Sequence, residues 1–127
     1  MEVFNLTLQE WLNENWAALS ARVNRPVRTI ELGSRCKYRL NGIANDLSPN
    51  NCCFIGVTIK PEKYQKHWDV AFGDGAKDVT PELWPELSDA AHEALSSLQE
   101  IHDLHDPDTW KDKFSQWLRD NHLTAPE

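Results

Sequence analysis

The sequence predicts an α+β fold: an N-terminal helix, an antiparallel sheet of three to five strands, and two C-terminal helices packed on one face of the sheet. The central observation is the stretch Cys52–Phe72, because apolar residues alternate with a period of two at both of its ends. The segments before and after it show helical spacing instead. A length of 127 residues indicates a single domain, residues 1–127.

The first predicted element is a helix that starts after Thr7. Thr7 and Glu10 have the spacing of a capping box, in which each side chain binds the backbone N–H of the other residue. Pro26 should end the helix, because it disfavours helical geometry at Arg25. The apolar face consists of Leu8, Trp11, Leu12, Trp16, Leu19 and Val23.

The middle of the chain predicts strands separated by turns. The strongest turn signal is Asn41-Gly42, and Gly33-Ser34 is a second. Residues 43–51 form a loop that leaves room for one further short strand. The four predicted strands are Val27–Leu32, Arg35–Leu40, Cys52–Lys60 and His67–Phe72.

The C-terminal half predicts two amphipathic helices. The first runs to about His105 and begins either near Thr80 or afresh at Pro85. Asp106 is the natural cap of the second helix. Its apolar face consists of Trp110, Phe114, Trp117 and Leu118, at positions i, i+4, i+7 and i+8.

The motifs that would indicate catalysis, a metal or a bound cofactor are absent. The sequence holds no nucleophile elbow and no phosphate-binding loop. His102, His105 and Asp106 can share a helix face, but they fall short of a tetrahedral ligand set. We therefore expect no enzyme, no metal site and no cofactor. Three cysteines, no leader pattern and no long apolar run indicate a cytoplasmic protein without a membrane span.

The charge is distributed unevenly along the chain. The net charge is −7. Residues 22–40 hold six basic side chains against one acid, whereas residues 74–127 hold thirteen acids against four bases. An acidic surface of this kind attracts a basic partner and speeds its arrival.

In size, charge and mixed α/β build, the chain resembles the bacterial toxin-immunity proteins. The resemblance implies a tight complex that neutralises a basic, secreted nuclease toxin. In such complexes acidic side chains flank aromatic anchors. Trp84 or Trp110 would be the anchor here. The full set of predicted partner-binding residues is Trp84, Glu93, Glu100, Asp103, Asp106, Asp108, Trp110 and Asp112.

Three alternatives remain open. A secretion chaperone or other dimeric module would bind through its sheet, and the sequence does not decide between a monomer and a homodimer. A small enzyme would need a deep pocket that holds His67 or His102. A nucleic-acid-binding domain would use Arg35, Lys37 and Arg39 as a basic stripe, but the net negative charge argues against nucleic acid.

Overall fold

The computed structural model describes residues 6–24, 38, 44–45, 53–65, 68 and 76–126. Within these ranges every regular element is helical. The α-helices are α1 (Leu8–Val23), α2 (Phe54–Thr58), α3 (Ala76–Leu83), α4 (Asp89–Leu104) and α5 (Trp110–Asp120), and the short 3₁₀ helices are η2 (Pro61–Lys63) and η4 (Pro107–Thr109). The α+β prediction is therefore wrong, because this part of the chain holds helices and no strand.

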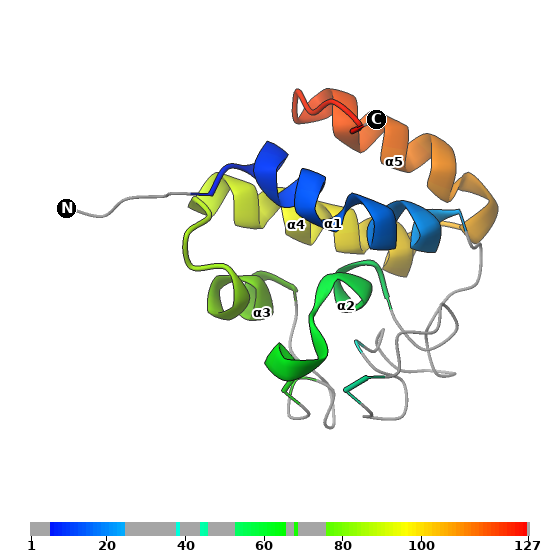
Figure 1. Cartoon of the computed structure of the whole chain (residues 1–127). Helices are drawn as coiled ribbons and strands as arrows, with labels where there is room; N and C mark the ends of the chain where they lie inside the picture. Colours follow the sequence, from blue (N-terminus) through cyan, green and yellow to red (C-terminus); the bar gives the residue numbers. More distant parts are fainter. Residues whose placement is uncertain are drawn as a thin grey trace.

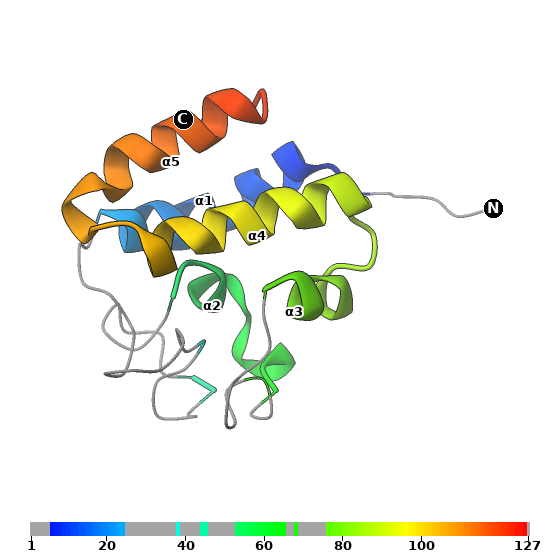
Figure 2. The ribbon, with the colours of Figure 1, turned by 180° about the vertical axis from the view of Figure 1, so that it is seen from behind.

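The helices are arranged in three layers (Figures 1 and 2). α1 and α4 lie side by side in the middle layer. α5 lies on one side of them and contacts both, while α2 and α3 lie on the other side. α2 packs against α1 and α4, and α3 packs against α4. The buried apolar side chains of all five helices form one cluster, whose largest fully buried members include Trp11, Trp68 and Trp110.

The first helix begins as its sequence predicts. The Glu10 backbone N–H donates to Thr7 Oγ1 (3.1 Å), and the Thr7 backbone N–H donates to Glu10 Oε1 (3.0 Å). Hydrogen bonding from the Thr7 backbone N–H, and from the Thr7 hydroxyl, lowers the pKa of the Glu10 carboxyl, because it favours the ionised form. The helix ends at Val23, and Asn24 caps it.

The predicted strand Cys52–Lys60 is instead the site of α2. Cys53 caps this helix, since its Sγ accepts the backbone N–H of Gly56 at 3.3 Å. The Ile55 N–H donates to Gln99 Oε1 of α4 at 3.0 Å. Residues 53–56 are all buried. A segment enclosed on every side is apolar throughout, and periodicity cannot then distinguish a strand from a short helix.

The other predicted strands, Val27–Leu32, Arg35–Leu40 and His67–Phe72, lie outside the described residues except for Tyr38 and Trp68. Both of these side chains are buried. Their rings meet edge to face, with centroids 6.3 Å apart. The basic stripe of Arg35, Lys37 and Arg39 also lies outside the described residues.

The long helix predicted up to His105 is divided into α3 and α4. α4 begins at Asp89, because the Ser88 hydroxyl caps it by accepting the Ala91 N–H at 3.2 Å. Pro81 lies within α3. The prediction of a helix that carries Trp110, Phe114 and Trp117 is confirmed by α5, in which all three side chains are buried.

Among the residues that the structure describes, no helix is both long and apolar enough to cross a lipid bilayer.

Candidate partner-binding surface

The exposed side of α4 is a narrow stripe. Its exposed side chains are Asp89, Ala90, Glu93, Ser97, Glu100 and Leu104. At 3.6 residues per turn these six positions fall within an arc of about 100°. Every other side chain described on α4 is buried or half-buried. Figure 2 shows α4 at the front of the molecule.

The stripe carries negative charge and no base. Asp89, Glu93 and Glu100 span about 16 Å along the helix, given a rise of 1.5 Å per residue. The carboxylates of Glu93 and Glu100 form no hydrogen bond or ion pair with the described residues. Leu104 follows on the same face and is 72% exposed, the most accessible large apolar side chain in the described ranges.

Two further predicted acids continue this surface beyond the end of α4. Asp106 and Asp108 are both exposed, on either side of the first residue of η4. The backbone carbonyl of Asp106 accepts the Thr109 N–H at 2.9 Å and the Thr109 hydroxyl at 2.7 Å. Both bonds use the backbone carbonyl of Asp106, so its side-chain carboxylate takes no part in the turn. The side chain of Asp103 lies outside the described residues.

Asp112 lies in a different electrostatic setting. It is exposed on α5 between the exposed Lys111 and Lys113. Farther along α5, Arg119 donates to Gln116 at 2.9 Å and Gln116 donates to Asp120 at 2.6 Å. The outer face of α5 is thus of mixed charge, whereas the exposed acids described on α4 and η4 have no exposed base among them.

Trp110 does not lie on the surface, contrary to its predicted role as an anchor. Its side chain is 0% exposed. It packs edge to face on Phe54 (4.9 Å between centroids) and stacks on His102 (5.1 Å). Its indole N–H donates to the His105 carbonyl at 3.1 Å. Trp110 therefore joins α5 to α2 and α4 as part of the core.

The sequence analysis missed the role of Arg22, which is 1% exposed. Arg22 Nη2 lies 3.4 Å from His102 Nε2. Its guanidinium carbon lies 5.3 Å from the Trp110 ring and 5.9 Å from the Phe54 ring, distances typical of cation–π contacts. Arg22 lies three positions after Leu19 and directly before Val23, on the apolar face of α1. This helical spacing was the sequence signal that the Arg22 side chain is buried.

The candidate metal ligands do not converge. His102 is fully buried and contacts Arg22, a cation that would repel a metal ion. Within the described residues, no group of three or more His, Cys, Asp or Glu side chains is placed to hold a metal ion.

A second buried histidine joins α3 to α4. His92 Nδ1 lies 2.9 Å from the Thr80 hydroxyl. Burial lowers the pKa of His92 below its usual value of 6.5, and the nearby Asp89 carboxylate opposes this shift only in part. The imidazole is therefore held in its neutral form over a wider pH range than in an exposed histidine.

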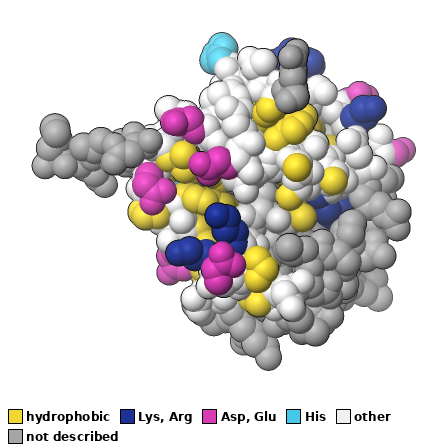
Figure 3. Space-filling view, in the orientation of Figure 1, with side chains coloured by type: hydrophobic (Ala, Val, Ile, Leu, Met, Phe, Trp, Pro, Cys, Tyr) yellow, Lys and Arg dark blue, Asp and Glu magenta, His cyan; other side chains and the backbone are white. Residues whose placement is uncertain are grey.

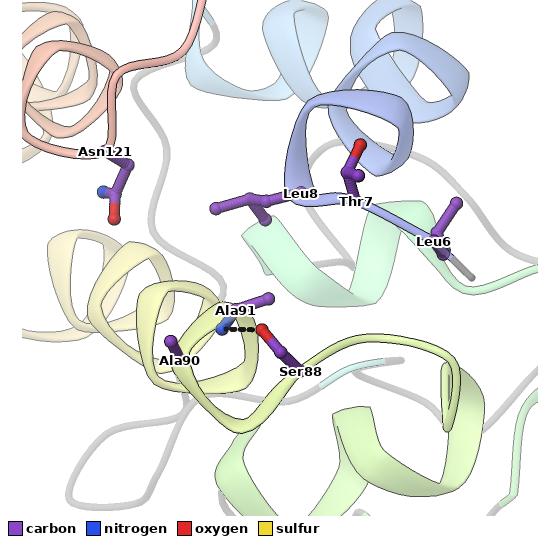
Figure 4. Close-up of a pocket in the computed structure, with 7 residues that line it drawn as sticks. All are labelled: Leu6, Thr7, Leu8, Ser88, Ala90, Ala91 and Asn121. Carbon is purple, nitrogen blue, oxygen red and sulfur yellow. Dashed lines mark hydrogen bonds between the residues drawn. The ribbon is translucent and has the colours of Figure 1, made fainter. Parts of the chain in front are cut away.

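Two further hollows are present, of which the larger lies away from the α4 stripe and the smaller reaches it at Ala90. The larger, about 610 Å³, includes Trp84, a half-buried side chain at the α3–α4 junction. The smaller, about 430 Å³, lies where α1 and α4 begin (Figure 4). Its hydroxyls, Thr7 and Ser88, already accept backbone N–H groups as helix caps. Leu6, Leu8, Ala90 and Ala91 supply most of the remaining wall.

No protein family, curated protein or solved structure matches this chain.

Proposed function

We propose that this protein is a small acidic inhibitor that neutralises a basic protein partner, as toxin-immunity proteins neutralise secreted nuclease toxins. The partner binds to the acidic surface formed by the α4 stripe and η4. The observation that carries this proposal is the stripe itself, which presents Asp89, Glu93 and Glu100 in one row with no base among them.

The location of the acids favours binding over a purely solubilising role. The carboxylates of Glu93 and Glu100 have no partner among the described residues, so they remain available to lysine and arginine side chains. Among the side chains that the structure describes between Asp78 and Asp120, ten exposed acids oppose three exposed bases, and the bases lie on α5. A basic partner is therefore drawn toward α4 rather than α5.

Leu104 supplies the apolar contact that had been assigned to Trp110. It lies at the end of the stripe, with Glu100 before it and Asp106 and Asp108 after it. An apolar side chain flanked along the chain by charged ones matches the usual division of an interface into an apolar centre and a polar rim. Trp84 lies at the larger hollow and forms no part of this surface.

The experiment uses the protein encoded beside this one in its genome as the candidate toxin. We expect equimolar addition of the purified protein to abolish the nuclease activity of that toxin. Leu104→Ser should weaken the inhibition at least tenfold, because the substitution removes the apolar contact but leaves the fold unchanged. Ala18→Ser, at an exposed position of α1 outside this surface, is the control and should inhibit like the wild type. Full nuclease activity at a molar excess of the wild-type protein would contradict the proposal.

A further inference from the structure

The larger hollow is a groove between three parts of the chain. α1, the α2–η2 connection and the α3–α4 junction border it, and its volume is about 610 Å³. This volume lies within the range of small-ligand sites. None of the residues that line the groove belongs to the α4 stripe. The two surfaces can therefore act independently.

The walls of the groove carry opposite charges. Glu14 of α1 and Glu86 of the α3–α4 junction supply two carboxylates, and Lys60 and Lys63 supply two ammonium groups from the α2–η2 connection. All four side chains are exposed. None of them forms an ion pair or a side-chain hydrogen bond with the described residues. Figure 3 shows charged side chains of both signs around hydrophobic atoms on this face.

An apolar platform lies between these charges. Trp84 lines the groove together with Leu83 and the buried Ile59. The Trp84 ring meets the fully buried Trp11 edge to face, with centroids 5.4 Å apart and planes at 83°. This contact fixes the orientation of Trp84, so a ligand meets a surface that is already ordered.

We propose that this groove binds a free peptide of two to four residues in its zwitterionic form. The ammonium group at the N-terminus of the peptide donates to the Glu14 and Glu86 carboxylates. Its C-terminal carboxylate accepts from the Lys60 and Lys63 ammonium groups, and an apolar side chain rests on Trp84. Such a ligand carries both charges that the groove complements, at the two ends of one short molecule.

The test is a titration with the peptides Leu-Ala, Ala-Leu-Ala and Ala-Leu-Ala-Ala, followed through the Trp84 indole N–H signal in an NMR spectrum. The signal is assigned from a Trp84→Phe variant. We expect at least one free peptide to shift this signal saturably. The same peptide with an acetylated N-terminus and an amidated C-terminus should bind at least about fivefold more weakly, since exposed ion pairs contribute up to about fivefold each.

Variants distinguish the groove from the α4 stripe. Lys60→Gln combined with Lys63→Gln should weaken binding of the free peptide by about fivefold or more. Glu93→Gln combined with Glu100→Gln should leave peptide binding unchanged, because these residues lie outside the groove. Equal binding of free and capped peptides, or no shift of the Trp84 signal with any of the three, would overturn the proposal. These two outcomes would leave the proposed inhibition of a basic partner unaffected, because that inhibition uses the α4 stripe and η4.

Discussion

At the scale of single residues, three buried polar side chains are held by specific partners. His102 contacts Arg22, His92 contacts Thr80, and Gln99 accepts the N–H of Ile55. A buried polar group without a partner costs stability, and these contacts offset that cost. The His102–Arg22 and Gln99–Ile55 contacts join residues 80 and 44 positions apart, so the sequence pattern alone could not have revealed them.

The buried imidazole of His92 predicts that stability depends on pH. Its pKa is lower in the folded protein than the usual 6.5 of an unfolded chain. Below pH 6.5 the unfolded state therefore binds more protons, and stability is lost as the pH falls toward the folded-state pKa. Above pH 6.5 this contribution is fully present.

The measurement is the free energy of unfolding by urea at a series of pH values. His92→Asn keeps a polar group near the Thr80 hydroxyl but does not titrate. We expect the variant to have a flatter profile than the wild type immediately below pH 6.5. If the two profiles were parallel, the pKa of His92 would be the same in the folded and unfolded states, and the prediction would be wrong.

Gly56 predicts a second effect at a single residue. A Cβ atom at this position would lie 2.6 Å from the carbonyl oxygen of Tyr38 and 2.9 Å from its Cα. Both are backbone atoms, so the clash cannot be relieved by a side-chain rotation. Gly56→Ala should therefore destabilise the protein by about 1–3 kcal/mol in urea unfolding. Helix propensity alone would give the opposite sign, a gain of about 1 kcal/mol, and observing that gain would refute the close packing of α2.

At the scale of elements, the sequence located the helices whose two faces differ. α1 and α5 were predicted because their apolar residues recur at helical spacing and form one face, with polar residues on the opposite face. α1 also has a capping box. α2 was missed because it is five residues long, is buried on nearly every side and carries Gly56, a poor helix former, at its centre. The start of α4 was predicted too early in the chain, near Thr80 or at Pro85, because Pro81 and Pro85 both fit the first turn of a helix. The Ser88 hydroxyl determines where α4 begins.

The cap of α4 gives a prediction at this scale. Ser88→Ala removes the acceptor for the Ala91 N–H, which lies 3.2 Å away. The loss of a serine cap should lower the free energy of unfolding by about 1 kcal/mol. Ser97→Ala, an exposed position within the same helix, serves as the matched control and should change stability by less than about 0.5 kcal/mol. Equal effects of the two substitutions would show that Ser88 does not cap the helix.

At the scale of the whole molecule, the sequence predicted the charge asymmetry but not the surface that presents it. The excess of acids between residues 74 and 127 is visible in the sequence. Which of these acids share a face depends on where α4 begins and on how α2, α3 and α5 pack against it. The same packing places Trp110 in the core and leaves Leu104 exposed.

The central claim is that the acids of α4 attract a basic partner. Its most direct test is the association rate constant with the candidate toxin, measured by stopped-flow fluorescence over a range of salt concentrations. We predict that the rate for the wild-type protein falls steeply with added salt, because salt screens the charges that guide the encounter.

The decisive comparison uses two double variants that each remove two negative charges. Glu93→Gln with Glu100→Gln should slow association at low salt and flatten its salt dependence. Glu62→Gln with Asp120→Asn, which removes exposed acids from η2 and α5, should retain most of the wild-type rate. Equal rates for the two double variants at low salt would contradict the account, because the position of the acids on α4 would then have no effect.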